Sequence, residues 1–329
     1  MTALLPCRIL LLGWTTLLFF EDRPLTAEKP KAAVPPAAAQ ALAVRKVRKA
    51  FAAEFRAKDR EARSALAGRL VEAARTETDA AVKYVLLTQA RKIAEDLADA
   101  GRVTGAVDAL FAAFDVHAVD VLAAALARTA RNARDPAAAK ALTDAAFAAV
   151  DRCIDAQLLR PMKTLETLIR RTAKKAKDDA FAAAAEARVE TARARFKERE
   201  ARQAQLQEAI LKWARTKVGE QVGGGECLDF VRAALAAAGA ETRLPYYTFG
   251  RRLYPGEMPR PGDVLAHIYT DGAGTGRHHV VLITEVAALD RFAILHQNVS
   301  NVRRVVEGRY DMKSVNCDAY YIYRPRLRE

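Results

Sequence analysis

Apolar residues recur every three or four positions along the first two thirds of the chain, which is the spacing of amphipathic helices. Val44, Val47, Phe51 and Phe55 lie on one face of the first such helix. Prolines at helix-opening positions mark several of the boundaries that follow. The pattern predicts further helices over residues 59–76, 79–100, 103–116, 117–133, 136–159, 161–176 and 178–215.

The pattern changes after residue 216. Three consecutive glycines, residues 223–225, resist helix, and the run after them predicts a short helix from Cys227 to Gly239. Alternating apolar and polar residues then predict β-strands. The strands are expected at residues 264–269, 278–286, 291–298, 303–306 and 319–323.

Glycine content supports the same division, because 12 of the 16 glycines lie after Thr216. We therefore expect an α+β multidomain protein. Residues 40–215 would form an all-α helical-hairpin array or a bundle, and residues 216–329 an α+β domain with an antiparallel sheet. The successive paired helices loosely resemble tetratricopeptide arrays, without their fixed repeat length.

The N-terminus is typical of a secretory signal. Arg8 precedes a mainly apolar run over residues 9–20, which is too short to span a bilayer, and cleavage is expected after Ala27. Cys7 precedes the apolar run, so the order is wrong for a lipoprotein signal. Residues 28–39 are rich in proline and alanine and indicate a linker. We expect an exported protein without an integral membrane span after cleavage.

The net charge of +13 lies mostly before residue 216, because the segment after it carries 15 basic and 13 acidic residues. The basic residues of the helical region alternate with acidic ones, and few aromatic residues accompany them. This composition predicts solvated helix faces and argues against nucleic-acid binding. A protein partner of the helical region is possible on this pattern.

The mature chain would keep Cys153, Cys227 and Cys317, too few for a disulfide scaffold. A bridge between Cys317 and either of the other two is the structural alternative to a reactive thiol. Cys227 is the candidate nucleophile, because the unpaired N–H groups and the dipole of a helix N-terminus stabilise a thiolate. Glu226 and Asp229 oppose this effect, so the thiolate would need an imidazolium neighbour.

Strand alternation selects the histidines that could provide that neighbour. His279 shares a strand face with Val281, and His296 and Asn298 share a face of the next strand. If these strands pair, His279 can contact His296 or Asn298. A nucleophile, a base and an orienting group would then lie together, as acyl transfer requires.

These residues carry a family resemblance. The stretch from Glu226 to Val231 resembles the nucleophile helix of papain-like NlpC-type and CHAP-type cysteine hydrolases. Residues 261–264 (Pro-Gly-Asp-Val) resemble the turn that opens their sheet. Residues 279–286 resemble their histidine strand, and residues 296–298 the CHAP strand that ends Glu-Gln-Asn. The resemblance covers roughly the last 110 residues.

The resemblance implies Cys227 as nucleophile and His279 as general base. His296 would orient the base in an NlpC-type site, or Asn298 in a CHAP-type site, and His296 is slightly favoured. Gln221 lies at the offset of the oxyanion-hole glutamine of papain-like enzymes. Enzymes of this type mostly cleave peptidoglycan peptides or other amide links, which implies a peptidoglycan or peptide substrate and no cofactor or metal.

Two other functions compete with this hypothesis. Four of the five histidines lie between His267 and His296, and three of them with Cys227 could bind zinc. Alternatively, the chain is a non-catalytic exported binding or scaffold protein, in which the helical region recruits partners beside an inert papain-like domain. His117 stands apart from the other histidines and is expected to be structural.

Overall fold

The structure is a computed structural model that describes residues 31–245, 247–254, 256–270, 276–299, 302–315 and 317–328. The expected signal peptide, residues 1–27, lies outside the described residues. The expected linker is described from residue 31. Its last three residues belong to the first helix, and Ala32 lies beside Phe114 in a bridge made by backbone hydrogen bonds to Ala113 and Asp115.

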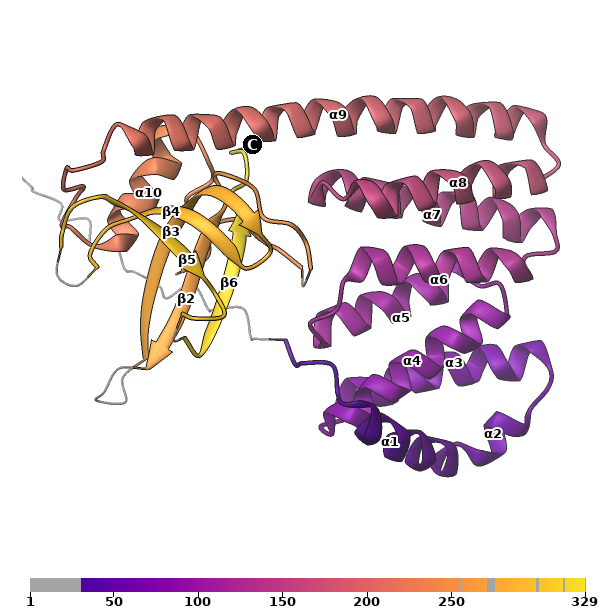
Figure 1. Cartoon of the computed structure of the whole chain (residues 1–329). Helices are drawn as coiled ribbons and strands as arrows, with labels where there is room; N and C mark the ends of the chain where they lie inside the picture. Colours follow the sequence, from indigo (N-terminus) through magenta and orange to yellow (C-terminus); the bar gives the residue numbers. More distant parts are fainter. Residues whose placement is uncertain are drawn as a thin grey trace, which may run out of the picture.

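Helices fill the first two thirds of the described chain. In Figure 1 antiparallel helices stack in layers, and α9 runs along the top of the molecule from this stack to the sheet. The layers form an array, and each layer contacts the next. The helices are α1 (Ala37–Ala50), α2 (Ala52–Arg56), α3 (Arg60–Thr76), α4 (Ala80–Asp96), α5 (Ala100–Ala113), α6 (Ala118–Asn132), α7 (Pro136–Ala156), α8 (Leu159–Lys175) and α9 (Asp179–Arg215).

Aspartate caps begin most of these helices. The side chains of Asp59, Asp79, Asp99, Asp135 and Asp178 each accept a hydrogen bond from a backbone N–H of the first turn. One cap corrects the sequence prediction. Because Asp99 starts α5 at residue 100, the expected break near Gly101 is wrong, and that glycine lies inside the first turn.

The last third forms a six-stranded antiparallel sheet with strand order β1-β6-β2-β3-β4-β5. The α+β fold class expected from the sequence is therefore confirmed. The strands are β1 (Arg251–Arg252), β2 (Val264–Thr270), β3 (Gly276–Ala288), β4 (Arg291–His296), β5 (Val306–Asp311) and β6 (Ala319–Arg324).

The strand predicted at residues 303–306 is wrong, since β5 begins where that prediction ends. Gly308 lies in the middle of β5, and glycine normally argues against a strand. A Cβ atom at residue 308 would lie 3.0 Å from Nε2 of His296. The glycine is therefore explained by the close approach of that imidazole, which the sequence pattern could not reveal.

Helix α10 (Cys227–Ala237) packs on one face of this sheet. Phe230, Val231 and Leu235 lie in a core with residues from the adjoining face of β2 and β3, such as Val264 and Val280. The opposite face buries a second cluster, which contains Leu265, Val281, Ile283, Phe292 and Ile294. The sheet is therefore covered on both faces.

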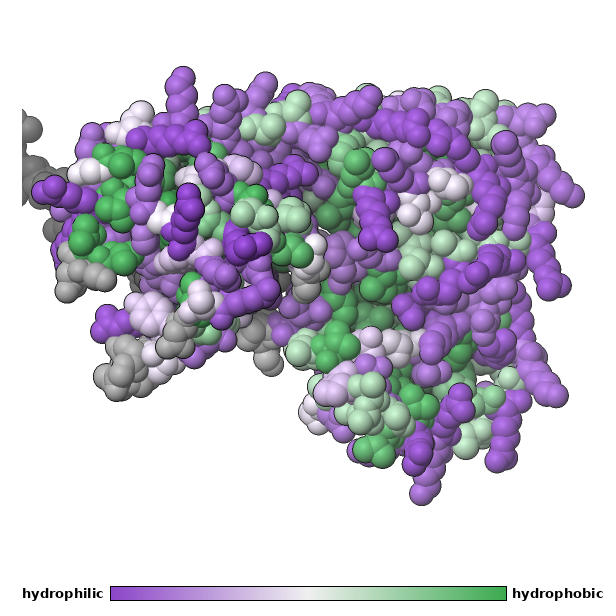
Figure 2. Space-filling model, in the orientation of Figure 1, coloured by the Kyte–Doolittle hydropathy of each residue, from purple (hydrophilic) through white to green (hydrophobic). Residues whose placement is uncertain are grey.

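Helix α9 connects the helical array with the sheet. Leu206 and Ile210, near its end, belong to the core under α10. Outside α9, the ring of His117 packs on that of Tyr254 with centroids 3.8 Å apart. These contacts hold the array beside the sheet. Hydrophilic side chains cover most of the visible face of α9 (Figure 2), and no described helix has the length and apolar character of a membrane span.

A buried ion pair and a hydrogen bond connect strand β6 and helix α9 to Asp263, the residue before β2. Arg324 donates to both carboxylate oxygens of Asp263, at 3.2 and 2.9 Å, and Gln207 Nε2 donates to the same carboxylate at 2.8 Å. Arg324 is 3% exposed and Asp263 fully buried. Burial raises the pKa of Asp263, and the charge and hydrogen bonds of Arg324 oppose that shift.

Asp263→Ala is expected to reduce the free energy of unfolding by about 3 kcal/mol, because it leaves the buried Arg324 guanidinium with Glu257 as its one carboxylate partner among the described residues and removes the acceptor of Gln207. Chemical denaturation monitored by circular dichroism measures this loss. Lys313→Ala, which removes an ion pair at a lysine side chain that is 80% exposed, serves as control and should cost less than about 1 kcal/mol. Equal losses in the two variants would contradict the importance of the buried pair.

Candidate active site

Cys227 is the first residue of α10, as the sequence predicts. The chain approaches it through the three-glycine turn, and the carboxylate of Asp229 accepts hydrogen bonds from the backbone N–H groups of Gly224 and Glu226, at 2.9 and 3.3 Å. Asp229 therefore holds the turn that precedes the cysteine. The N–H groups of the first turn of α10 have no partner within the helix and can bind a developing negative charge.

The side chain of Gln297 fixes this turn to the end of β4. Its Oε1 accepts from the N–H of Val222 at 2.8 Å, and its Nε2 donates to the carbonyls of Val222 and Glu226 at 3.0 and 2.9 Å. The amide is fully buried. Gln297 thus connects the residue before the cysteine to the strand that carries His296.

Asn298 lies beside this clamp, and among the described residues its side chain forms no hydrogen bond with the proposed base. Its Nδ2 donates to the Glu226 carboxylate at 2.6 Å, and its backbone adopts φ 62°, which asparagine tolerates better than most residues. The structure therefore brings Asn298 to the residue before Cys227, and brings His296 to His279.

His279 and His296 form a hydrogen-bonded imidazole pair. Nε2 of His279 lies 3.3 Å from Nδ1 of His296, and the two residues are 7% and 6% exposed. One of these nitrogens donates and the other accepts, so the bond fixes the orientation of both rings. Nδ1 of His279 is then the nitrogen left to meet another group.

The thiol of Cys227 is buried near the middle of β3. It packs in the core under α10, to which Val280 also belongs, whereas His279 lies on the other side of the strand pleat. No hydrogen bond joins the sulfur to the His279 ring among the residues that the structure describes. The sulfur lies instead against β3 at the backbone N–H of Val280, the residue after His279.

Burial dominates the protonation of the site. It raises the pKa of the Cys227 thiol, and the backbone N–H groups of Val280 and Leu228 only partly offset this effect. Burial, followed by the charges of His267 and His296, lowers the pKa of His279 to about 3. The free site therefore combines a protonated thiol with uncharged imidazoles.

Two residues beside this pair were missed or only partly used by the sequence analysis. His267 on β2 lies opposite His279, with ring centroids 5.3 Å apart. Tyr310 on β5 packs against both His267 and His296. Strand parity could have indicated His267, whereas Tyr310 lies outside the strand that the sequence predicted.

Other candidates lie apart from the pair. Gln221 is exposed and donates to the carbonyl of Gly223 at 3.3 Å, so its amide points into its own turn. Cys153, Cys227 and Cys317 are free thiols, which excludes the alternative disulfides. No group of three histidine, cysteine or acidic side chains is arranged to hold a metal ion within the described residues, so the zinc alternative gains no support.

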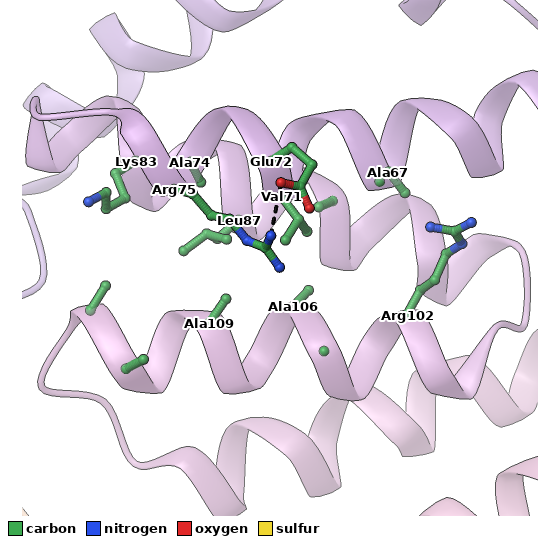
Figure 3. Close-up of a pocket in the computed structure, with 15 residues that line it drawn as sticks. Ala67, Val71, Glu72, Ala74, Arg75, Lys83, Leu87, Arg102, Ala106 and Ala109 are labelled. Carbon is green, nitrogen blue, oxygen red and sulfur yellow. Dashed lines mark hydrogen bonds and ion pairs between the residues drawn. The ribbon is translucent and has the colours of Figure 1, made fainter.

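A pocket of about 590 Å³ lies elsewhere, among α3, α4 and α5 (Figure 3). Seven of its fifteen lining residues are alanine, with Arg75, Lys83 and Arg102 along the wall, and Arg75 pairs with Glu72 at 3.0 Å. Neither cysteine nor histidine lines this pocket. It therefore lacks the groups that acyl transfer needs.

The buried imidazoles predict that the protein loses stability in acid. Folded His279 stays uncharged down to about pH 3, whereas in the unfolded chain it takes up a proton near pH 6.5. Below that pH the unfolded state binds more protons, and His279 alone should lower the free energy of unfolding by about 2 kcal/mol at pH 5. Urea unfolding near pH 7.5 and 5 measures this loss, which should shrink in His279→Gln. The exposed His278→Gln is the control, and equal losses in all three proteins would contradict the explanation.

Comparison with known proteins adds little to this geometry. No family model and no curated protein matches the chain. A solved structure described as "The crystal structure of Ly7917 with the hydrolyzing product of MDP" is 21% identical, with a TM-score of 0.28, and a second, "The crystal structure of Ly7917", is 19% identical, with a TM-score of 0.27. Each match covers 36% of this chain and 62% of the other. This chain thus spans less than two thirds of those proteins. A likeness at such TM-scores does not establish a shared fold or a shared function.

Proposed function

We propose that the chain is an exported thiol hydrolase that cleaves an amide bond in peptidoglycan peptides, with Cys227 as nucleophile and His279 as general base. The observation that carries the proposal is the buried hydrogen bond between His279 and His296, next to a cysteine at a helix N-terminus. The resemblance of the last third to NlpC-type and CHAP-type hydrolases supports the same assignment. Export rests on the sequence pattern of residues 1–27.

The first step is transfer of the thiol proton to Nδ1 of His279. Rotation about the Cα–Cβ bond of Cys227 moves the sulfur between staggered positions, and one of them would turn it from Val280 toward the histidine. Nδ1 can accept this proton only if the neutral His279 ring carries its own proton on Nε2, which then donates to Nδ1 of His296 and keeps the ring in place. The positive charge formed on His279 then stabilises the Cys227 thiolate, which burial of the sulfur otherwise disfavours.

The thiolate attacks the amide carbonyl, and a C–S bond forms as the carbonyl oxygen becomes negative. Backbone N–H groups at the start of α10 are placed to bind that oxygen, whereas the amide of Gln221 is turned away. His279 next gives its proton to the leaving amine, and the C–N bond breaks. Water, deprotonated by His279, then releases the acyl group from sulfur.

One observation favours the alternative, a non-catalytic binding protein. The thiol is protonated and has no hydrogen bond to His279 in the free protein. An activity probe that reacts with thiolates distinguishes the two functions, because an enzyme should label at Cys227 well before the buried Cys153, whose pKa burial raises to about 12. Labelling without preference would favour the binding protein.

Cys227→Ala and Cys227→Ser should each abolish hydrolysis and leave the fold intact, because the side chain is small and the helix does not depend on it. Purified peptidoglycan and casein, incubated separately with each protein, reveal the activity, and mass spectrometry of the products identifies the bond that is cut. Hydrolysis at the wild-type rate in both variants would end the proposal. Cleavage of casein alone would reassign the substrate class.

His279→Ala should slow alkylation of Cys227 by iodoacetamide at neutral pH by about 100-fold or more, because positioned acid–base help of this kind contributes about 100- to 10,000-fold. His278→Ala is the matched control. That residue is the exposed neighbour of His279 and stacks on Tyr247, with ring centroids 4.3 Å apart. Equal effects of the two substitutions would show that His279 is not the base.

A further inference from the structure

Three imidazoles lie in a row across neighbouring strands. His267 on β2 faces His279 on β3, and His279 faces His296 on β4, with centroid distances of 5.3 and 5.5 Å. All three residues are at most 7% exposed. The proposed mechanism uses His279 and His296, and it leaves His267 without a role.

The stability of the fold does not explain why residue 267 is a histidine. Its Nδ1 is buried and has no hydrogen-bond partner among the described residues. An unpaired buried nitrogen destabilises a folded protein, and an apolar ring of similar shape would avoid that cost. The presence of an imidazole therefore needs another explanation.

In the proposed mechanism neither nitrogen of His279 is available for the missing bond. Nε2 is engaged by His296, and Nδ1 is the atom that the thiol needs. His267 must therefore act on His279 through its charge and not through a hydrogen bond. Apart from the two other histidines, the titratable side chains that pack or pair against it in the described part of the chain are tyrosines: Tyr269 on β2, Tyr310 on β5, and Tyr320 on the paired strand β6.

We propose that His267 is a positioning residue that controls when His279 can take the thiol proton. The row holds one positive charge at a time. While His267 is uncharged, the charge can form on His279. Once His267 is protonated in acid, a second charge 5.3 Å away is disfavoured on the order of 100-fold, and the thiolate is lost. This inference rests on the proposed function.

The surrounding groups agree with this role. Burial, and after it the charge of His296, lowers the pKa of His267, so the ring is uncharged at neutral pH. Burial first and the charge of Cys227 second raise the pKa of Tyr310 to about 12, so its hydroxyl keeps its proton and adds no charge. No carboxylate forms a hydrogen bond or ion pair with His267 in the described part of the chain.

The test is the pH dependence of Cys227 alkylation by iodoacetamide in the full chain, between about pH 4.5 and 8, without substrate. His267→Phe and His267→Gln should both keep the neutral rate within a few fold. In each variant the ratio of the rate at about pH 5 to that at about pH 8 should rise about tenfold, because the competing charge is gone. His278→Phe is the matched control and should keep the wild-type profile.

Unchanged profiles in both His267 variants would overturn the inference, and so would loss of alkylation at every pH in both variants with native circular dichroism. The second result would make His267 a base in its own right. The outcome is independent of substrate. Hydrolysis that survives Cys227→Ala would remove the proposed function alone, whereas Cys227-dependent hydrolysis with unchanged profiles would remove this inference alone.

Discussion

The hydrogen bonds of Gln297 are the contacts on which the candidate site depends. Its buried amide joins the turn before α10 to the end of β4, and Asn298 adds a second hydrogen bond between the same two segments, so the cysteine and the two histidines are positioned together. The pairing of β3 with β4 brings the two strands together, and the rings of His279 and His296 meet on one face of them. Asp229 fixes the path of the three-glycine turn from the side of α10, and Gln297 fixes the turn to the sheet.

Burial determines the protonation state of the site in the free protein. The imidazole pair is held rigidly because water is excluded, and the same exclusion favours the uncharged forms of the thiol and of His279. Charge separation must therefore come from substrate binding or from movement of the sulfur toward the ring. A site that is uncharged at rest would protect the thiol from side reactions.

Much of this arrangement could be predicted from the sequence. Period-three to four patterns located the helices, and strand alternation placed His279 on one face of its strand and His296 with Asn298 on one face of the next, because both signals are local. The predicted boundary between α4 and α5 was wrong. Gly101 favours a break by its propensity, whereas the helix cap is Asp99, two residues earlier. The strand predicted at residues 303–306 was misplaced relative to β5, because Gly308 argues against a strand by its propensity. The reason for that glycine is the close approach of His296, a residue that is distant in sequence.

The contacts of the site could not be predicted, because they are made across the fold. The preference for His296 over Asn298 depends on Asn298 reaching Glu226, and the position of Gln221 depends on the shape of a glycine turn. Gln297 appeared in the sequence only as part of a resembling motif. Its role becomes visible once its three hydrogen bonds are known.

The central claim is that the sulfur of Cys227 carries the acyl group during hydrolysis. Rapid acid quenching of the protein with peptidoglycan peptides, followed by mass spectrometry of its proteolytic fragments, tests this directly. The account predicts an acyl mass on the fragment that contains Cys227, which hydroxylamine removes. Product formation with that fragment unmodified at every quench time, or an adduct on another residue, would contradict it.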